Sequence, residues 1–183
     1  MKILDTEISD IKIIEPRIFE DERGFFFESF NLKQFRGVTG LGTVDFVQDN
    51  HSKSVQGTLR GLHYQIRHTQ GKYIRVVKGK IFDVVVDLRK SSSTFGKWVG
   101  EVLSDENRKC LWVPSGFAHG FYVMSEEAEI TYKCTDYYAA DYERTLLWND
   151  PQVGITWPLV KDNAILSDRD RAGNPLSDCE TFA

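Results

Sequence analysis

The chain has 183 residues, of which 41% are hydrophobic, and a formal net charge of -4. This length supports a sizeable core and is close to the commonest domain size, so we expect residues 1–183 to form a single domain. There is no run of lysine or arginine and no apolar segment of membrane-spanning length, which argues against nucleic acid and membrane as partners.

The expected secondary structure consists mainly of short β-strands, because turn residues recur at short intervals and helical periodicity is scarce. In chain order the expected strands are 25–30, 44–50, 58–65, 73–78, 81–88, 98–103, 109–113, 120–124 and 129–138. A short helix is expected at 32–35, and the region after Trp157 should be mostly irregular. About nine short strands predict a mainly β protein with a jelly-roll fold.

The clearest predicted strand pair joins 73–78 to 81–88 through the turn Lys78-Gly79-Lys80. In the second strand four apolar residues share one face by the two-residue period, and we expect this face to lie in the core. They are Phe82, Val84, Val86 and Leu88.

The first residues and the cysteines indicate where the protein resides. Acidic residues at Asp5 and Glu7 interrupt the apolar core that a signal peptide requires, which predicts a cytoplasmic protein. The three cysteines, at positions 110, 134 and 179, are odd in number and lack metal-ligand spacing. We therefore expect free thiols and no disulfide framework.

Two histidine motifs carry most of the chemical information. RGLHYQ (60–65) and PSGFAHG (114–120) each place a histidine beside a glycine or proline turn within β-type sequence, which predicts a pocket containing His63 and His119. In a regular strand Arg60 and His63 would face opposite ways, but a bulge at Gly61 would bring both to one side. From local sequence alone, His63 is also consistent with a core histidine and Arg60 with a surface ion pair.

The other candidate residues are ambiguous when each is taken alone. Lys72 opens a strand and is consistent with a solvated lysine, and Tyr132 with a packed strand tyrosine. Asp170 is at the third position of a helical turn capped by Ser167, which is a structural role as well. Tyr138 suits base stacking or edge-strand packing.

A metal site is the main alternative to acid–base chemistry. The spacing Pro-x-Gly-x-x-His at 114–119 resembles the second motif of cupins, many of which bind a metal through three histidines and a glutamate. The first cupin motif requires His-x-His and a following glutamate, whereas His63 is followed by Tyr64 and Gln65. We therefore expect a cupin-type fold without a metal.

Several longer motifs together resemble one enzyme family, that of dTDP-4-dehydrorhamnose 3,5-epimerase. They are DERGFFFE (21–28), FVQDNHS (46–52), LRGLH (59–63), VVVDLR (84–89), WVPSGFAHGF (112–121) and LWNDP (147–151), with LSDRD (166–170) extending the match. The resemblance implies a cupin-type jelly roll, a homodimer, a dTDP-linked 4-keto-6-deoxyhexose substrate and no cofactor.

The same resemblance implies a role for each matching position. The base falls on His63 with Asp170 as its partner, the opposing acid on Tyr132, and the group that holds the 4-keto oxygen on Lys72. The ring that stacks on thymine falls on Tyr138. The remaining positions around the nucleotide sugar are Arg23, Glu28, Gln48, Asp49, Asn50, Arg60, His119, Glu143 and Arg169. Arg169 stands where the family often has lysine, so its contact geometry should differ.

These roles agree with the chemistry of a 4-keto sugar. The keto group acidifies the hydrogens on carbons 3 and 5, and removal of either leaves negative charge on the carbonyl oxygen. Inversion then requires a cation at that oxygen, a base on one face of the ring and an acid on the other. Two alternatives remain open: an enzyme that inverts one carbon only, and a sugar-binding jelly roll without catalytic activity.

Overall fold

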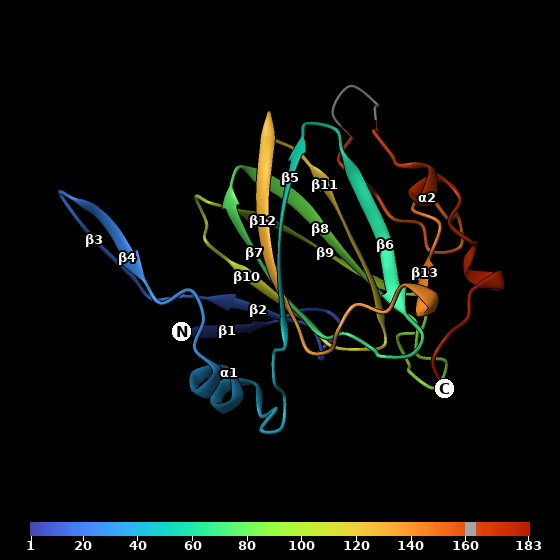
Figure 1. Ribbon diagram of the computed structural model, residues 1–183, viewed down its shortest axis with the longest axis horizontal. Helices are drawn as coiled ribbons and strands as arrows, with labels where there is room; N and C mark the ends of the chain where they lie inside the picture. Colours follow the sequence, from blue (N-terminus) through green and yellow to red (C-terminus); the bar gives the residue numbers. More distant parts are fainter. Residues whose placement is uncertain (160–163) are drawn as a thin grey trace.

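The computed structural model describes residues 1–159 and 164–183, and two antiparallel β-sheets dominate it (Figure 1). The larger sheet has the strand order β1 (Lys2–Asp5), β2 (Lys12–Glu15), β10 (Cys110–Val113), β7 (Lys72–Lys78), β12 (Glu127–Cys134), β5 (Gln48–Val55). The smaller sheet has the order β13 (Glu143–Thr145), β6 (Leu59–Gln65), β11 (Phe117–Val123), β8 (Lys80–Asp87), β9 (Trp98–Ser104). The prediction of a mainly β jelly roll is confirmed.

The core lies in three layers, and β8 is buried on both faces. Between the sheets, Ile81 and Val85 of β8 pack in the largest hydrophobic cluster together with Ile74 and Ile130. On the opposite face of β8, Val84, Val86 and Leu88 are fully buried beneath the C-terminal region, and Phe82 packs at the edge of this second cluster. The predicted core face is therefore buried, and so is the face opposite.

A helix covers the outer face of the larger sheet. Helix α1 (Leu32–Thr39) begins after Asn31, whose side chain accepts a hydrogen bond from the Gln34 amide, and ends at Gly40 in the left-handed conformation. Phe35 on this helix is fully buried in a third cluster with Tyr73 and Trp112. The sequence predicted the start of this helix but ended it four residues too early.

The predicted pairing of 73–78 with 81–88 is wrong, although both strands exist. At Gly79 (φ 80°) the chain crosses from the larger sheet to the smaller one, so β7 pairs with β10 and β12, and β8 with β9 and β11. A short glycine turn favours a hairpin, but burial of both faces of β8 requires it to be an inner strand of the second sheet.

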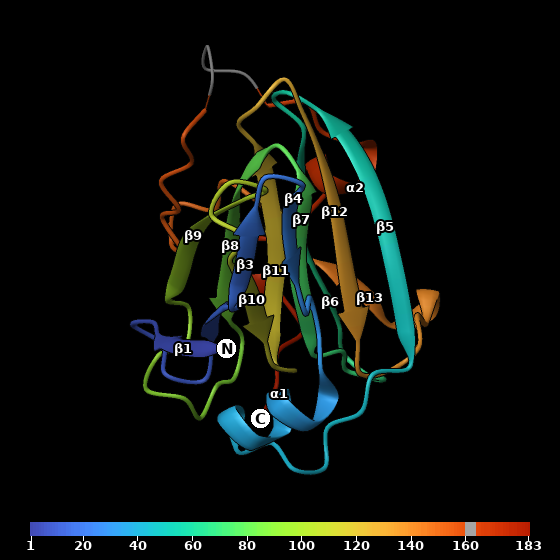
Figure 2. The same ribbon diagram turned by 90° about the vertical axis from the view of Figure 1, so that its left-hand side faces the viewer.

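The N-terminal region contains more structure than the sequence indicated. Strands β1, β2 and β3 (Ile18–Asp21) were not predicted individually, and β4 (Gly24–Phe27) is shorter than expected. Strands β3 and β4 form a separate two-stranded hairpin that projects from the sheets (Figures 1 and 2). Phe25 and Phe26 on this hairpin are 59% and 71% exposed.

The C-terminal region is mostly irregular, as predicted, and closes over the smaller sheet. Its described residues include one turn of α-helix, α2 (Asp168–Arg171), and one turn of 3-10 helix, η3 (Leu176–Asp178), and the region joins the sheet through isolated bridges. One of these links Arg89 to Phe182, next to the end of the chain. No helix in the described part of the chain is long and apolar enough to cross a membrane.

Candidate active site

Two adjoining cavities lie between the sheets and share one set of polar side chains. The larger measures about 330 Å³ and the smaller about 140 Å³. Five residues line both cavities: His63, Lys72, His119, Tyr132 and Arg169. The larger cavity adds Gln48, Asn50, Tyr138 and Glu143, and the smaller adds Arg60. The structure therefore brings ten of the residues expected from sequence to one place.

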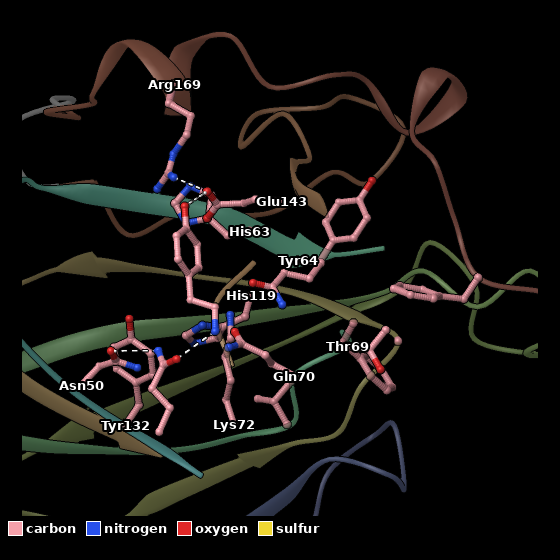
Figure 3. A pocket seen from close by; sticks show the side chains of 17 residues that line it. Asn50, His63, Tyr64, Thr69, Gln70, Lys72, His119, Tyr132, Glu143 and Arg169 are labelled. Atoms are coloured by element: carbon pink, nitrogen blue, oxygen red, sulfur yellow. Dashed lines mark hydrogen bonds and ion pairs between the residues drawn. The ribbon is translucent and has the colours of Figure 1, made fainter. Parts of the chain in front are cut away.

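The shared residues come from both sheets. His63 on β6 and His119 on β11 belong to the smaller sheet, whereas Lys72 on β7 and Tyr132 on β12 belong to the larger one. Figure 3 shows His63 and Tyr132 approaching the cavity from opposite sides, with Lys72 and His119 also lining it. A ligand between the sheets would meet an imidazole on one face and a phenol on the other.

A bulge in β6 gives His63 its direction, as the sequence predicted. In the pairing with β11 the register shifts, so that His63 is opposite His119 but Arg60 is opposite Phe121. Gly61 adopts φ 114° at this point, and a Cβ on Gly120 would lie 2.6 Å from the Arg60 carbonyl oxygen. Both glycines are required, because only bare backbones can approach this closely.

His63 is held by a buried carboxylate. Its Nε2 lies 2.7 Å from Asp170 Oδ1, and the same oxygen accepts the Gly61 amide at 3.1 Å. Ser167 caps helix α2 by accepting the Asp170 amide and donates its hydroxyl to Asp170 Oδ2 at 2.6 Å. Asp170 therefore has the predicted third position of the turn capped by Ser167 and also contacts His63. These contacts fix the imidazole with Nδ1 as the remaining ring nitrogen.

Burial sets the protonation state of this pair. Burial lowers the pKa of His63 below its ordinary 6.5, the nearby cations Arg169 and Lys72 lower it further, and the contact with Asp170 opposes the shift. Burial also acts to raise the pKa of Asp170, but its hydrogen bonds with His63 and Ser167 hold that pKa well below the ordinary value. At neutral pH this arrangement favours a neutral imidazole beside a carboxylate, which is the form that can accept a proton.

The pKa values of Lys72 and Tyr132 are shifted in opposite directions. Burial lowers the pKa of the Lys72 ammonium, while the nearby Cys134, Asp83 and Glu143 counteract the shift. Burial raises the pKa of Tyr132 above its ordinary 10, so the phenol keeps its proton at neutral pH. No hydrogen bond holds the Tyr132 hydroxyl among the residues described, which leaves it available to a ligand.

The mouth of the larger cavity is a network of polar residues around Tyr138. The Tyr138 amide donates to Gln48 Oε1 at 2.8 Å, and its hydroxyl donates to Glu143 Oε2 at 2.9 Å. Arg169 pairs with the same carboxylate. Gln48 also donates to Asn50 Oδ1 at 3.1 Å. Tyr138 remains 54% exposed, so its ring face is accessible for stacking.

Four expected site residues line neither cavity: Asp170, which contacts the cavity residue His63, and Asp49, Arg23 and Glu28. Asp49 points to the opposite face of β5 from Gln48 and Asn50, because neighbouring residues of a strand alternate, and pairs with Lys133. Arg23 pairs with Asp21 on the projecting hairpin, with its side chain 84% exposed, and Glu28 accepts a hydrogen bond from Gln34 near helix α1.

Several residues that line the larger cavity were not singled out from the sequence. They are Tyr64, Gln65, Thr69, Gln70, Val113, Gly116, Phe117 and Phe182. Most flank the predicted histidine motifs and Lys72, so proximity to these motifs was the available signal. Phe182 had no such signal, because a bridge to Arg89 brings the chain end back to the sheet.

The described residues contain no cluster of three or more histidine, cysteine, aspartate or glutamate side chains suited to a metal ion. Around His63 and His119, the nearest acidic groups are each hydrogen-bonded to one imidazole, Asp170 to His63 and Asp83 to His119. These carboxylates therefore orient histidines within two separate pairs.

Comparison with known proteins identifies the family. The family model for dTDP-4-dehydrorhamnose 3,5-epimerase matches residues 5–178. The dTDP-4-dehydrorhamnose 3,5-epimerase of Pseudomonas aeruginosa is 54% identical, with 100% of this chain and 99% of the relative covered. This chain belongs to the dTDP-4-dehydrorhamnose 3,5-epimerase family.

Solved structures of the epimerase family share the fold. The Legionella pneumophila 3,5-epimerase in complex with dTDP-4-keto-L-rhamnose superposes with a TM-score of 0.95 at 51% identity, covering 98% of this chain and 94% of that one. A 3'-monoepimerase from Streptomyces bikiniensis, in complex with dTDP-quinovose, has a TM-score of 0.87 at 34% identity, covering 94% and 87%. The same fold is therefore found in a 3,5-epimerase and in a 3'-monoepimerase. Of these two proteins, the 3,5-epimerase has the higher sequence identity to this chain.

Proposed function

We propose that the two cavities bind dTDP-4-keto-6-deoxy-D-glucose and that four side chains perform its epimerisation. The enzyme inverts carbons 3 and 5 to give dTDP-4-keto-L-rhamnose, a step of dTDP-L-rhamnose biosynthesis. The observation that carries the residue roles is the placement of His63 and Tyr132 on facing sheets, with Lys72 on the same sheet as Tyr132 and lining the same cavity. The runner-up remains inversion of a single carbon.

Each inversion is a proton removal followed by a proton return. His63 takes the hydrogen as a proton on Nδ1, and the electrons of the broken C–H bond form a carbon–carbon double bond while the carbonyl electrons move to the 4-oxygen. Lys72 stabilises the resulting oxyanion, a contribution of about 3 to 4 kcal/mol for a positioned donor. Tyr132 then gives its proton to the carbon from the opposite face, and exchange with water restores both groups.

The cavity mouth would hold the nucleotide. The exposed face of Tyr138 suits stacking on thymine, and Arg60 and Arg169 are the cations positioned for the diphosphate. This chemistry is complete without a cofactor or metal ion, since a base, an acid and a cation supply every step.

Turnover of dTDP-4-keto-6-deoxy-D-glucose in deuterated water tests the reaction directly. We expect deuterium at both carbon 3 and carbon 5 of the product, because each inversion returns a solvent-derived proton. Mass spectrometry counts the labels and NMR locates them. Label at one carbon, with inversion only there, would establish the runner-up instead, and an unlabelled ligand would indicate a binding protein without catalytic activity.

We also propose that the active enzyme is a homodimer. Phe25 and Phe26 expose large apolar surfaces on the projecting hairpin, which isolated monomers rarely do. Arg23 on the same hairpin lies outside this chain's cavities, although the family resemblance places it near the nucleotide sugar. A dimer in which each hairpin packs on the other copy would bury the phenylalanines and supply Arg23 to the partner's site.

Complementation between two inactive variants tests the shared site. We expect Arg23→Ala to be weakly active alone and His63→Ala to be inactive alone. In co-expressed mixed dimers, one site combines intact His63 with intact Arg23, so activity should return to about a quarter of the wild-type level by random assortment. If mixing restores nothing although light scattering shows dimers, each site uses residues of one copy only.

Two further expectations rest on the chain itself. Cys110 and Cys134 are buried free thiols and Cys179 is a partly exposed one, which suits a reducing cytoplasm. Cell fractionation would detect any other location.

Strand β8 contributes to both the hydrophobic cluster between the sheets and the cluster beneath the C-terminal region. We therefore expect residues 1–183 to unfold as one domain in a single calorimetric transition.

A further inference from the structure

Strand β8 contains a buried carboxylate that neither the sequence motifs nor the proposed chemistry accounts for. Asp83 is 0% exposed and interrupts the apolar run from Ile81 to Val86. By the two-residue period it lies on the same face as Ile81 and Val85, which pack in the cluster between the sheets. A carboxylate in this position is costly unless it is paired.

The carboxylate of Asp83 is directed at a single partner. His119 Nε2 lies 2.9 Å from Asp83 Oδ1 and 3.0 Å from Oδ2, and no other hydrogen bond to Asp83 is present among the described residues. Asp87, four residues along the same face, provides a contrast. It is equally buried but binds Arg89, Ser92 and Thr94 of the following loop, which is a structural role.

This contact determines which ring nitrogen of His119 a ligand meets. A carboxylate accepts only, so His119 must donate through Nε2–H, and Nδ1 is the nitrogen left for the cavities. The ring lines both cavities, as does Lys72 (Figure 3). The free nitrogen therefore faces the region where the reacting sugar oxygen would be held.

We propose that Asp83 is a positioning residue for the epimerisation, which holds His119 with Nε2–H on the carboxylate and Nδ1 directed at the sugar beside Lys72. The proposal rests on the proposed function of this cavity and adds a second histidine–aspartate pair to the one formed by His63 and Asp170. The two pairs have different tasks: one accepts a carbon-bound proton, and the other orients a contact to oxygen.

The negative charge of Asp83 also helps to keep Lys72 protonated. Burial lowers the pKa of the Lys72 ammonium, and the Asp83 carboxylate is among the anions that counteract this shift. Lys72 needs its charge to stabilise the oxyanion, so removal of the Asp83 charge would weaken the same step that misorientation of His119 weakens.

The main test is Asp83→Asn, which keeps the shape and removes the charge. The asparagine amide can donate to an unprotonated Nε2, which moves the proton to Nδ1 and reverses what His119 presents to the sugar. We expect kcat to fall roughly ten- to a hundred-fold, as for carboxylates that orient histidines elsewhere. Because the nucleotide contacts lie at the cavity mouth, KM and the affinity for dTDP should remain within about two-fold.

Asp87→Asn is the matched control, since it makes the same substitution at an equally buried position of the same strand. We expect it to lower the melting temperature while kcat of the folded enzyme stays near the wild-type value. A double-mutant cycle adds a second check. If Asp83 acts through His119, then Asp83→Asn should cost less kcat in a His119→Asn background than in the wild type, and the remaining loss reports its charge on Lys72.

A measurement on the unaltered enzyme covers the case in which Asp83→Asn does not fold. Nitrogen-15 NMR of the histidine rings, with His119 assigned by its absence in His119→Asn, should show His119 protonated at Nε2 at neutral pH. A proton on Nδ1 alone, an unchanged kcat in Asp83→Asn, or an equal loss in Asp87→Asn would overturn the proposal. The ring signals require no turnover, so they separate this outcome from a failure of the proposed reaction.

Discussion

Replacement of His63 by alanine is expected to abolish both epimerisation and deuterium exchange into the substrate. Without the imidazole, the group assigned to remove the proton is absent, and general bases typically contribute a hundred- to ten-thousand-fold in rate. We therefore expect kcat to fall at least about a thousand-fold, while dTDP still binds, because the nucleotide contacts at Tyr138 and Arg169 remain. Exchange is followed by mass spectrometry and binding by calorimetry.

His51→Ala is the matched control for this variant. His51 lies on the exposed outer face of β5, pairs with Glu129 at 3.3 Å and lines neither cavity. We expect its removal to leave turnover within about two-fold, as for most surface substitutions. If folded His63→Ala exchanges deuterium at the wild-type rate, another residue is the base.

The fall of activity at low pH, the acid limb of the pH profile, is a second test of His63 as the base. The imidazolium is the inactive form of a base, so kcat/KM should fall as the pH drops through the pKa of His63 in the free enzyme. Burial and the charges of Arg169 and Lys72 lower that pKa, which moves the limb to a pH below 6.5. Asp170→Asn removes an opposing influence and should move the limb lower still. A limb above 6.5 would contradict this assignment.

The sequence predicted the site better than the pairing of the strands. His63 and His119 were predicted to share a pocket because each stands beside a glycine or proline turn in β-type sequence. Lys72 was ambiguous from local sequence and was assigned only through the family resemblance. Asp170 was correctly placed at the third position of a turn capped by Ser167, but its contact with His63 joins residues 107 apart in the chain. Only the resemblance to the epimerase family linked the two.

The sequence could not show which face of each strand is directed at the space between the sheets. Strand β8 is apolar on both faces, so Asp83 could be assigned to neither layer before the sheets were known. Similarly, Asp49 stands between Gln48 and Asn50 in a matching motif, yet strand alternation turns it out of the cavity. Likewise, β7 and β8 belong to different sheets because of how the whole chain packs, and the local turn at Gly79 does not determine this packing.

Replacement of Tyr132 by phenylalanine is expected to separate exchange from inversion. The variant keeps the ring and removes the proton that the opposite face delivers. His63 can still form the enolate, exchange its proton with water and return deuterium to the same face. We therefore expect label to enter the substrate at a measurable rate, while net inversion falls roughly a hundred- to a thousand-fold, as for loss of a general acid.

Two measurements on one sample distinguish these rates: mass spectrometry gives deuterium uptake, and a coupled reductase gives product of inverted configuration. Tyr137→Phe is the matched control, because Tyr137 is 65% exposed and lines neither cavity, so both of its rates should equal those of the wild type. The raised pKa of Tyr132 supports its role as a proton donor at neutral pH. If Tyr132→Phe binds dTDP but loses exchange as completely as His63→Ala, then the tyrosine is needed to form the enolate, and the division of roles between the two sheets is wrong.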